Sequence, residues 1–212
     1  DVHRLRGPIV NADEALGAEP RGKRRVLLRN ASALVSTSAV TAGLGFVYWV
    51  VAARLFEPAD LGQSATAIAA MSLIAPFTML GFGTLFIAEL PGTRQRRATL
   101  VATAAVMSGA AGTVIGLLAA LALPTSVLGI PGIGREFPIT ALFVAGVAAQ
   151  GVGLLLDQAL LSVVGGRMQL LRNVIASASK LVLLVVLALA VIRSGSVAIF
   201  ASWFAANVIS VA

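Results

Sequence analysis

Three charged residues within or at the edge of long apolar runs are the candidates for chemistry in this sequence. Asp157 and Lys180 lie in two successive apolar stretches, each about 9–10 Å inside the same predicted membrane boundary at 1.5 Å of rise per helical residue. Arg54 ends the first apolar stretch. A charge within the hydrocarbon core of a bilayer costs at least about 2.5–3.5 kcal/mol, so each of these residues needs a partner, a water-filled cavity or a function.

The matching depths of Asp157 and Lys180 predict an ion pair, which would offset much of the cost of burying both charges. Two interpretations follow. In the first, the pair only locks two neighbouring helices together, or Lys180 extends its ammonium to the membrane interface. In the second, one or both residues face a central water-filled cavity and bind a charged substrate or a coupling proton.

Arg54 also has two interpretations. It is either an interfacial anchor that pairs with Glu57 or Asp60, or a bidentate phosphate contact at the outer mouth of a cavity. The uncharged residues Gln150, Gln158 and Asn207 lie in later apolar stretches and are predicted to form hydrogen bonds between helices.

Several kinds of site are excluded by composition. The chain has no Cys, and its single His, His3, lies in a polar tail, so neither a thiolate or histidine metal centre nor a Ser-His-Asp triad is expected. It also contains no Gly-rich phosphate loop of the nucleotide-binding type. We therefore predict no catalytic residues, no metal and no cofactor, and a protein that is not an enzyme.

The elements that must position these residues are membrane helices. The chain of 212 residues is 58% hydrophobic and 12% charged, whereas soluble domains carry about 25% charged residues. Its net charge of +7 lies between long apolar runs, which argues against a nucleic-acid partner. We predict an all-α polytopic membrane bundle of five complete transmembrane helices, because five stretches reach the roughly 20 residues that a span needs. They are residues 31–53, 64–90, 99–123, 138–164 and 174–192.

A sixth apolar stretch starts near residue 197 and is still apolar at residue 212, so we expect a sixth helix truncated within a longer transporter. Residues 30–212 form the predicted bundle, and residues 1–29 a basic, disordered cytoplasmic tail that meets anionic headgroups. If the amino terminus is cytoplasmic, thirteen of the 16 Lys and Arg residues lie inside, which satisfies the positive-inside rule. The sequence KRRVLLR at 23–29 resembles an export signal, but the apolar stretch after it is too long.

Small residues and proline predict how the helices pack. Pro76, and the pair Gly43 and Gly45, predict kinks in the second and first helices. Gly112 and Gly116 form a small-xxx-small motif that predicts close packing of the third helix on another helix.

Three segments resemble a known family. Residues 29–32 (RNAS), 53–62 (ARLFEPADLG) and 170–173 (LLRN) are similar to the start and the fifth-helix entry of bacterial polysaccharide-export flippases. These proteins form the O-antigen-flippase-like branch of the multidrug/oligosaccharidyl-lipid/polysaccharide exporter superfamily. The resemblance covers roughly residues 29–212 and rests mainly on the second segment.

The resemblance implies two lobes of helices in the bacterial cytoplasmic membrane, of which this chain would be most of the amino-terminal lobe. It implies alternating access that carries a lipid-linked oligosaccharide to the outer leaflet for polysaccharide synthesis, with glycan polymerases or transferases as further partners. The substrate would carry an anionic pyrophosphate, so a cationic cavity would make Arg54 and Lys180 candidates for its binding.

Two alternatives stay open. A cation-coupled exporter of small molecules or drugs from the same superfamily would need a lone buried acid such as Asp157. A membrane subunit of envelope glycan synthesis would need catalytic carboxylates in an outer loop, and the predicted outer loops at 57–60 and 124–137 are short and poor in such groups.

Overall fold

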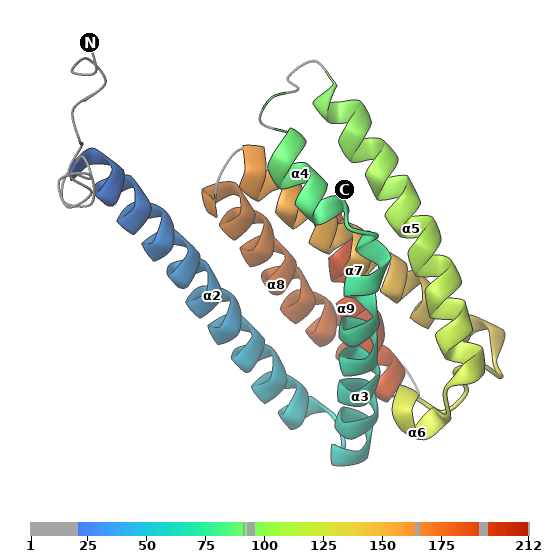
Figure 1. The fold of residues 1–212 in the computed structure, drawn as a ribbon. Coiled ribbons are helices and arrows are strands. Elements are labelled where there is room, and N and C mark those ends of the chain that lie inside the picture. Colours follow the sequence, from blue (N-terminus) through green and yellow to red (C-terminus); the bar gives the residue numbers. More distant parts are fainter. Residues whose placement is uncertain (1–20, 91, 93–95, 164–165, 191–194, 212) are drawn as a thin grey trace, which may run out of the picture.

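The computed structural model describes residues 21–90, 92, 96–163, 166–190 and 195–211, and all regular structure in these residues is helical (Figure 1). The predicted all-α bundle is confirmed. Five segments are long and apolar enough to cross a membrane, and a shorter apolar helix follows them. The elements are α2 (Arg21–Leu55), α3 (Pro58–Ile74), η1 (Ala75–Met79), α4 (Phe82–Glu89), α5 (Arg97–Ala122), α6 (Thr125–Leu128), α7 (Phe137–Val163), α8 (Gly166–Leu189) and α9 (Gly195–Val211).

The first helix differs from its prediction in two ways. It begins at Arg21 and not at residue 31, so residues 21–29 of the predicted tail are helical, while residues 1–20 lie outside the described residues. No kink is seen at Gly43 and Gly45, because α2 is continuous through both and runs straight in Figure 1. Glycine keeps its backbone N–H and therefore the helical hydrogen bonds; unlike proline, it weakens a helix without breaking it.

The break predicted at Pro76 is confirmed. Helix α3 gives way to the 3₁₀ segment η1, which contains Pro76, and α4 starts after Leu80 and Gly81. Both of these residues have positive φ, 48° and 80°. Proline has no N–H to donate and its ring clashes with the preceding turn. The predicted second span, residues 64–90, is therefore divided: the apolar span is Pro58–Met79, and α4 is a separate short helix after the turn at Leu80 and Gly81.

The small-residue motif packs α5 on α7, as predicted. A Cβ on Gly112 would lie 2.6 Å from the Cα of Ala148, and one on Gly116 would lie 3.2 Å from the Cβ of Val147. Only glycine permits this approach of two backbones. Helices in lipid depend on such close packing, because no hydrophobic driving force acts between them there.

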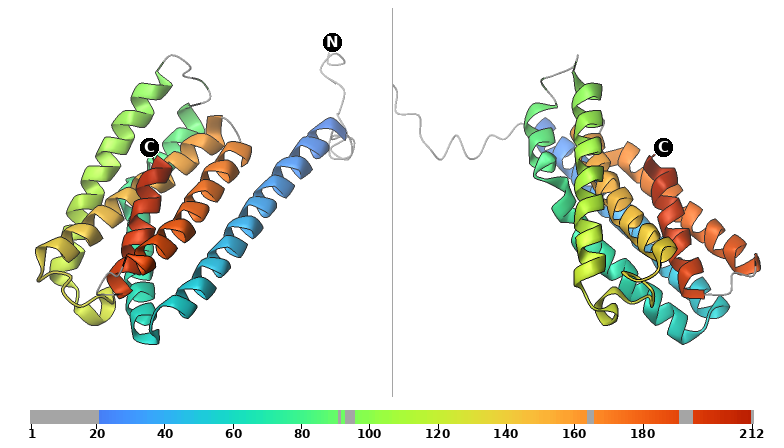
Figure 2. Two further views of the ribbon diagram at one scale, coloured as in Figure 1. Left: turned by 180° about the vertical axis from the view of Figure 1, so that it is seen from behind. Right: turned by 90° about the vertical axis from the view of Figure 1, so that its right-hand side faces the viewer.

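The main core lies where α2, α3, α7, α8 and α9 meet, and its largest buried side chains are the aromatic residues Tyr48, Phe143 and Phe200. The Tyr48 hydroxyl donates to the Ile199 carbonyl (3.1 Å) and lies 2.9 Å from the Ser202 Oγ, which ties α2 to α9. The Phe143 and Phe200 rings stack at 6.3 Å between α7 and α9. Elsewhere α2 runs at the edge of the bundle beside α8 (Figure 2).

Candidate functional site

A polar cavity of about 110 Å³ lies among α2, α7, α8 and α9. Its lining is unusual for a bundle this apolar, because charged and amide side chains from three helices converge there. They are Gln150, Asp157, Arg172, Asn173, Lys180 and Asn207. The structure therefore brings together Asp157 and Lys180, two of the three candidates predicted from the sequence.

Helical periodicity explains why these side chains converge. Residues three, four and seven positions apart share one face of a helix, and the polar residues of α7, α8 and α9 follow that spacing. Their faces carry Gln150, Gly153 and Asp157 on α7, Asn173, Ser177 and Lys180 on α8, and Trp203, Asn207 and Ser210 on α9.

Asp157 forms an ion pair with Arg172, and both side chains are mostly buried (21% and 14% exposed). The guanidinium also donates through Nη1 to the Gly153 carbonyl (3.1 Å) and through Nε to the Ser210 carbonyl (2.8 Å). One side chain of α8 thus ties α7 to α9. A planar guanidinium with five donors suits such a three-way contact.

The predicted Asp157–Lys180 ion pair is wrong. The prediction started the fifth helix at residue 174, which placed Arg172 in the loop and Lys180 at the depth of Asp157. Helix α8 instead starts at Gly166. Arg172 therefore lies inside the helix opposite Asp157, and Lys180 lies eight residues further along, which is about 12 Å deeper.

Lys180 points into the bundle. Its Nζ lies 3.6 Å from the centroid of the Trp203 ring, a cation–π contact between α8 and α9. The Trp203 ring in turn meets Tyr48 edge-on at 5.8 Å. Within the residues that the structure describes, no carboxylate pairs with Lys180. Its ammonium is thus held at the cavity by a ring and not neutralised by an acid.

An amide pair completes the cavity. Asn207 Nδ2 donates to Gln150 Oε1 at 2.8 Å, which confirms the predicted hydrogen bonding between helices for these two residues. Gln158, predicted to do the same, has no side-chain hydrogen bond among the described residues. Asn207 lies four residues from Trp203 on α9, so the pair is about one helical turn from the Lys180–Trp203 contact.

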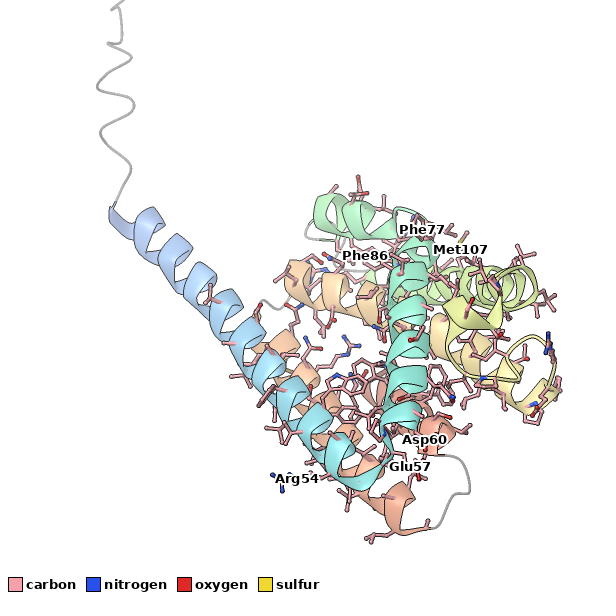
Figure 3. All side chains as sticks on the ribbon, turned by 90° about the horizontal axis from the view of Figure 1, so that it is seen from below. Arg54, Glu57, Asp60, Phe77, Phe86 and Met107 are labelled. Carbon is pink, nitrogen blue, oxygen red and sulfur yellow. The ribbon has the colours of Figure 1, made fainter. Side chains whose placement is uncertain are left out.

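Arg54 does not join the other two candidates. It is exposed at the end of α2, and Figure 3 shows its side chain on the outside of the α2–α3 turn, apart from Asp60. Among the described residues Arg54 has no ion pair, so the predicted pairing with Glu57 or Asp60 is not observed. The Asp60 carboxylate instead lies against Gly195, the first residue of α9. The helix dipole stabilises a negative charge at this N-terminal end.

Two features of the site escaped the sequence analysis, Arg172 and Trp203. Arg172 was assigned to the basic flank, and Trp203 lies in the shorter sixth apolar stretch. For Trp203 the available signal was a spacing of seven between polar or aromatic residues, seen at 203 and 210 and repeated at 150 and 157 and at 173 and 180. Arg172 is not part of this repeat.

A second cavity, of about 170 Å³, lies between α4 and α5 and is apolar. Phe82, Phe86, Leu90 and Leu100 contribute to its walls. In the part of the chain that the structure describes, no cluster of three or more His, Asp or Glu side chains is arranged to hold a metal ion.

The apolar spans indicate a multi-pass membrane protein whose environment is a lipid bilayer. Beyond this class, comparison with known proteins adds nothing: no family model, no curated protein and no solved structure matches the chain. What can be inferred about function comes from the polar cavity.

Proposed function

We propose that this protein is a membrane transporter that flips a lipid-linked oligosaccharide across the bacterial cytoplasmic membrane by alternating access, for polysaccharide synthesis and export. The observation that carries the proposal is the Lys180 ammonium, which faces a polar cavity among membrane helices without a paired carboxylate. A buried charge of this kind in a membrane bundle is a functional residue by default.

The charges of the cavity favour an anionic ligand. Arg172 neutralises Asp157, which leaves the Lys180 cation uncompensated. The Trp203 ring offsets about 2 kcal/mol or more of the burial cost, which is at least about 2.5–3.5 kcal/mol at the centre of a membrane helix, but a ring does not neutralise the charge. An anionic group such as pyrophosphate would supply the missing partner, and an ammonium offers it three donors.

The size of the cavity supports a change of shape during transport. A volume of about 110 Å³ is small beside the roughly 300–1,000 Å³ of typical ligand pockets, so it fits a phosphate-sized group but not an oligosaccharide. Entry of a glycan therefore requires helices to separate. Helix α2 is the element that we expect to move, because it runs at the edge of the bundle and contacts mainly α8 (Figure 2).

The proposal includes an orientation. Asp157, Arg172 and Ser210 lie toward the ends of α7, α8 and α9 that the positive-inside rule predicts to be cytoplasmic. A lipid-linked substrate would then enter from the cytoplasmic leaflet, its polyprenyl tail remaining in lipid. The exporter alternative has less support, because its lone acid, Asp157, is paired with Arg172.

The test is depletion of the full-length protein in its host, with complementation. We expect depletion to cause undecaprenyl-pyrophosphate-linked oligosaccharide to accumulate on the cytoplasmic leaflet and surface polysaccharide to be lost. Wild-type protein and Lys180→Arg should restore export, and Lys180→Met should not, at equal membrane abundance. If depletion causes no accumulation but raises sensitivity to cationic drugs, the flippase proposal is wrong and the exporter is favoured.

A further inference from the structure

The Gln150–Asn207 amide pair has hydrogen-bonding capacity that the fold does not use. From it we infer that the pair, with Asn173 beside it, is a subsite for the sugar that directly follows the anionic group at Lys180. The inference rests on the proposed function and deepens it, because it assigns the neutral part of the substrate to named residues.

The unused capacity follows from the hydrogen bonds. The bond from Asn207 Nδ2 to Gln150 Oε1 leaves the Gln150 nitrogen and the Asn207 oxygen without a partner among the described residues. Among the described residues, two side-chain polar atoms are both fully buried and without a partner, Gln169 Oε1 and Trp203 Nε1. The two unpaired atoms of the amide pair are not among them and are therefore accessible. Both residues line the polar cavity, so a ligand in the cavity can form hydrogen bonds with these atoms.

The pair presents one donor and one acceptor side by side. This holds whichever way the two amides are assigned, because each is a primary amide and one N–H···O bond between them leaves one of each kind. Two vicinal hydroxyls or an acetamido group both donate and accept, and so complement the pair. A phosphate at neutral pH mainly accepts, and so suits the Lys180 ammonium better than the amides.

Distances along the helices place the two subsites next to each other. Trp203, which holds Lys180, and Asn207 lie one turn apart on α9, or about 6 Å. Asn173 lines the same cavity, and its amide has no hydrogen-bond partner among the described residues. A group covalently attached to an anion at Lys180 would therefore lie beside the side-chain amides of Asn173, Asn207 and its partner Gln150.

The experiment measures binding of three probes to the full-length protein in lipid nanodiscs. The probes are undecaprenyl pyrophosphate, its glucosyl derivative and its N-acetylglucosaminyl derivative. We expect the wild type to bind at least one sugar-bearing lipid about tenfold more tightly than the bare pyrophosphate, as expected for one or two additional hydrogen bonds. A preference between the two sugars distinguishes recognition of hydroxyls from recognition of an acetamido group.

Variants assign the preference to the amides. Gln150→Met and Asn207→Leu should abolish the preference for sugar, measured as the ratio of the affinities for the sugar-bearing lipid and for bare undecaprenyl pyrophosphate. Gln158→Met is the matched control on the same helix, because Gln158 lies beside Gly83 of α4 and outside the cavity. The exchange Gln150→Asn with Asn207→Gln keeps one donor and one acceptor and should retain part of the preference.

The outcomes separate the two proposals. If the wild type binds all three lipids equally, or if the variants weaken all three equally, the amide pair only joins helices and this inference is overturned, while the proposed function stands. If the wild type binds none of the three lipids, the proposed function itself fails.

Discussion

Helix α7 has two faces that follow the same helical spacing. One packs closely against a neighbouring helix, and the other lines a cavity. Toward α5 it presents Val144, Val147 and Ala148, against which Gly112 and Gly116 pack backbone to backbone. Toward α8 and α9 it presents Gln150 and Asp157. On the first face small residues remove all space between the helices. On the second, longer polar side chains hold the helices apart around a cavity.

The difference teaches how a membrane bundle combines a rigid part with an adaptable one. Contacts between backbones cannot change without moving a whole helix, because side chains have no slack to absorb the shift. Contacts through Arg172, Lys180 and the amide pair can be exchanged for contacts to a ligand, one hydrogen bond at a time. We therefore expect substitutions on the first face to act on stability and those on the second to act on binding.

The largest expected effect comes from breaking the small-residue face. Gly112→Val would place side-chain atoms inside the Ala148 backbone, which cannot yield. We expect a loss of about 3 kcal/mol or more in the free energy of unfolding, at the upper end for overpacking. Unfolding of the purified protein in detergent with increasing denaturant measures it.

A matched control lies one turn away on the same helix. A Cβ at Gly109 would lie 3.6 Å from Val152 Cγ2, an ordinary contact, so Gly109→Ala should be neutral or stabilise α5 by up to about 1 kcal/mol. Equal destabilisation by both substitutions would mean that the close approach at Gly112 is not what holds α5 on α7.

Breaking the ion pair of the polar face is expected to have the next largest effect. Asp157→Asn leaves the Arg172 guanidinium mostly buried without its carboxylate. The expected cost is about 2–3 kcal/mol, below the usual 3–5 because the pair is partly exposed. The double variant Asp157→Asn with Arg172→Gln should recover most of the loss in a double-mutant cycle, and additive losses would argue against the pair.

These two predictions mark what the sequence could and could not supply. The spans follow from the length of apolar runs, and the contact of Gly112 and Gly116 from residue size, because both are local properties. The partner of Asp157 depends on where α8 starts and how it is rotated against α7. One misplaced helix start, at residue 174 in place of Gly166, changed the predicted partner from Arg172 to Lys180. A cavity was one of two interpretations of Asp157 and Lys180, but the rest of its lining could not be predicted, because those residues converge only where the rotated faces of three helices meet.

A substitution of Lys180 is expected to affect function without affecting stability, unlike substitutions of Gly112 or of the Asp157–Arg172 ion pair. Because Lys180 has no paired carboxylate among the described residues, Lys180→Met removes a charge without leaving another charge unpaired. We expect the free energy of unfolding to change by less than about 1 kcal/mol, since apolar replacements of buried charges are often neutral. Transport should nevertheless be lost, measured by surface polysaccharide in complemented cells. A strongly destabilised Lys180→Met would show that the contact with Trp203 is structural.

The smallest expected effect concerns the turn between η1 and α4, two elements that pack against α7. Leu80 has a left-handed conformation (φ 48°, ψ 28°) and is 56% exposed, so it combines backbone strain with little packing. Leu80→Gly should relieve about 1 kcal/mol of that strain and raise the melting temperature slightly, although glycine gains entropy in the unfolded chain. Leu85→Gly is the matched control, because Leu85 is 43% exposed within α4 and should cost about 1 kcal/mol. Opposite signs for the two substitutions would show that the turn after Pro76 is strained in the fold, whereas equal losses would show that Leu80 contributes packing that outweighs its strain.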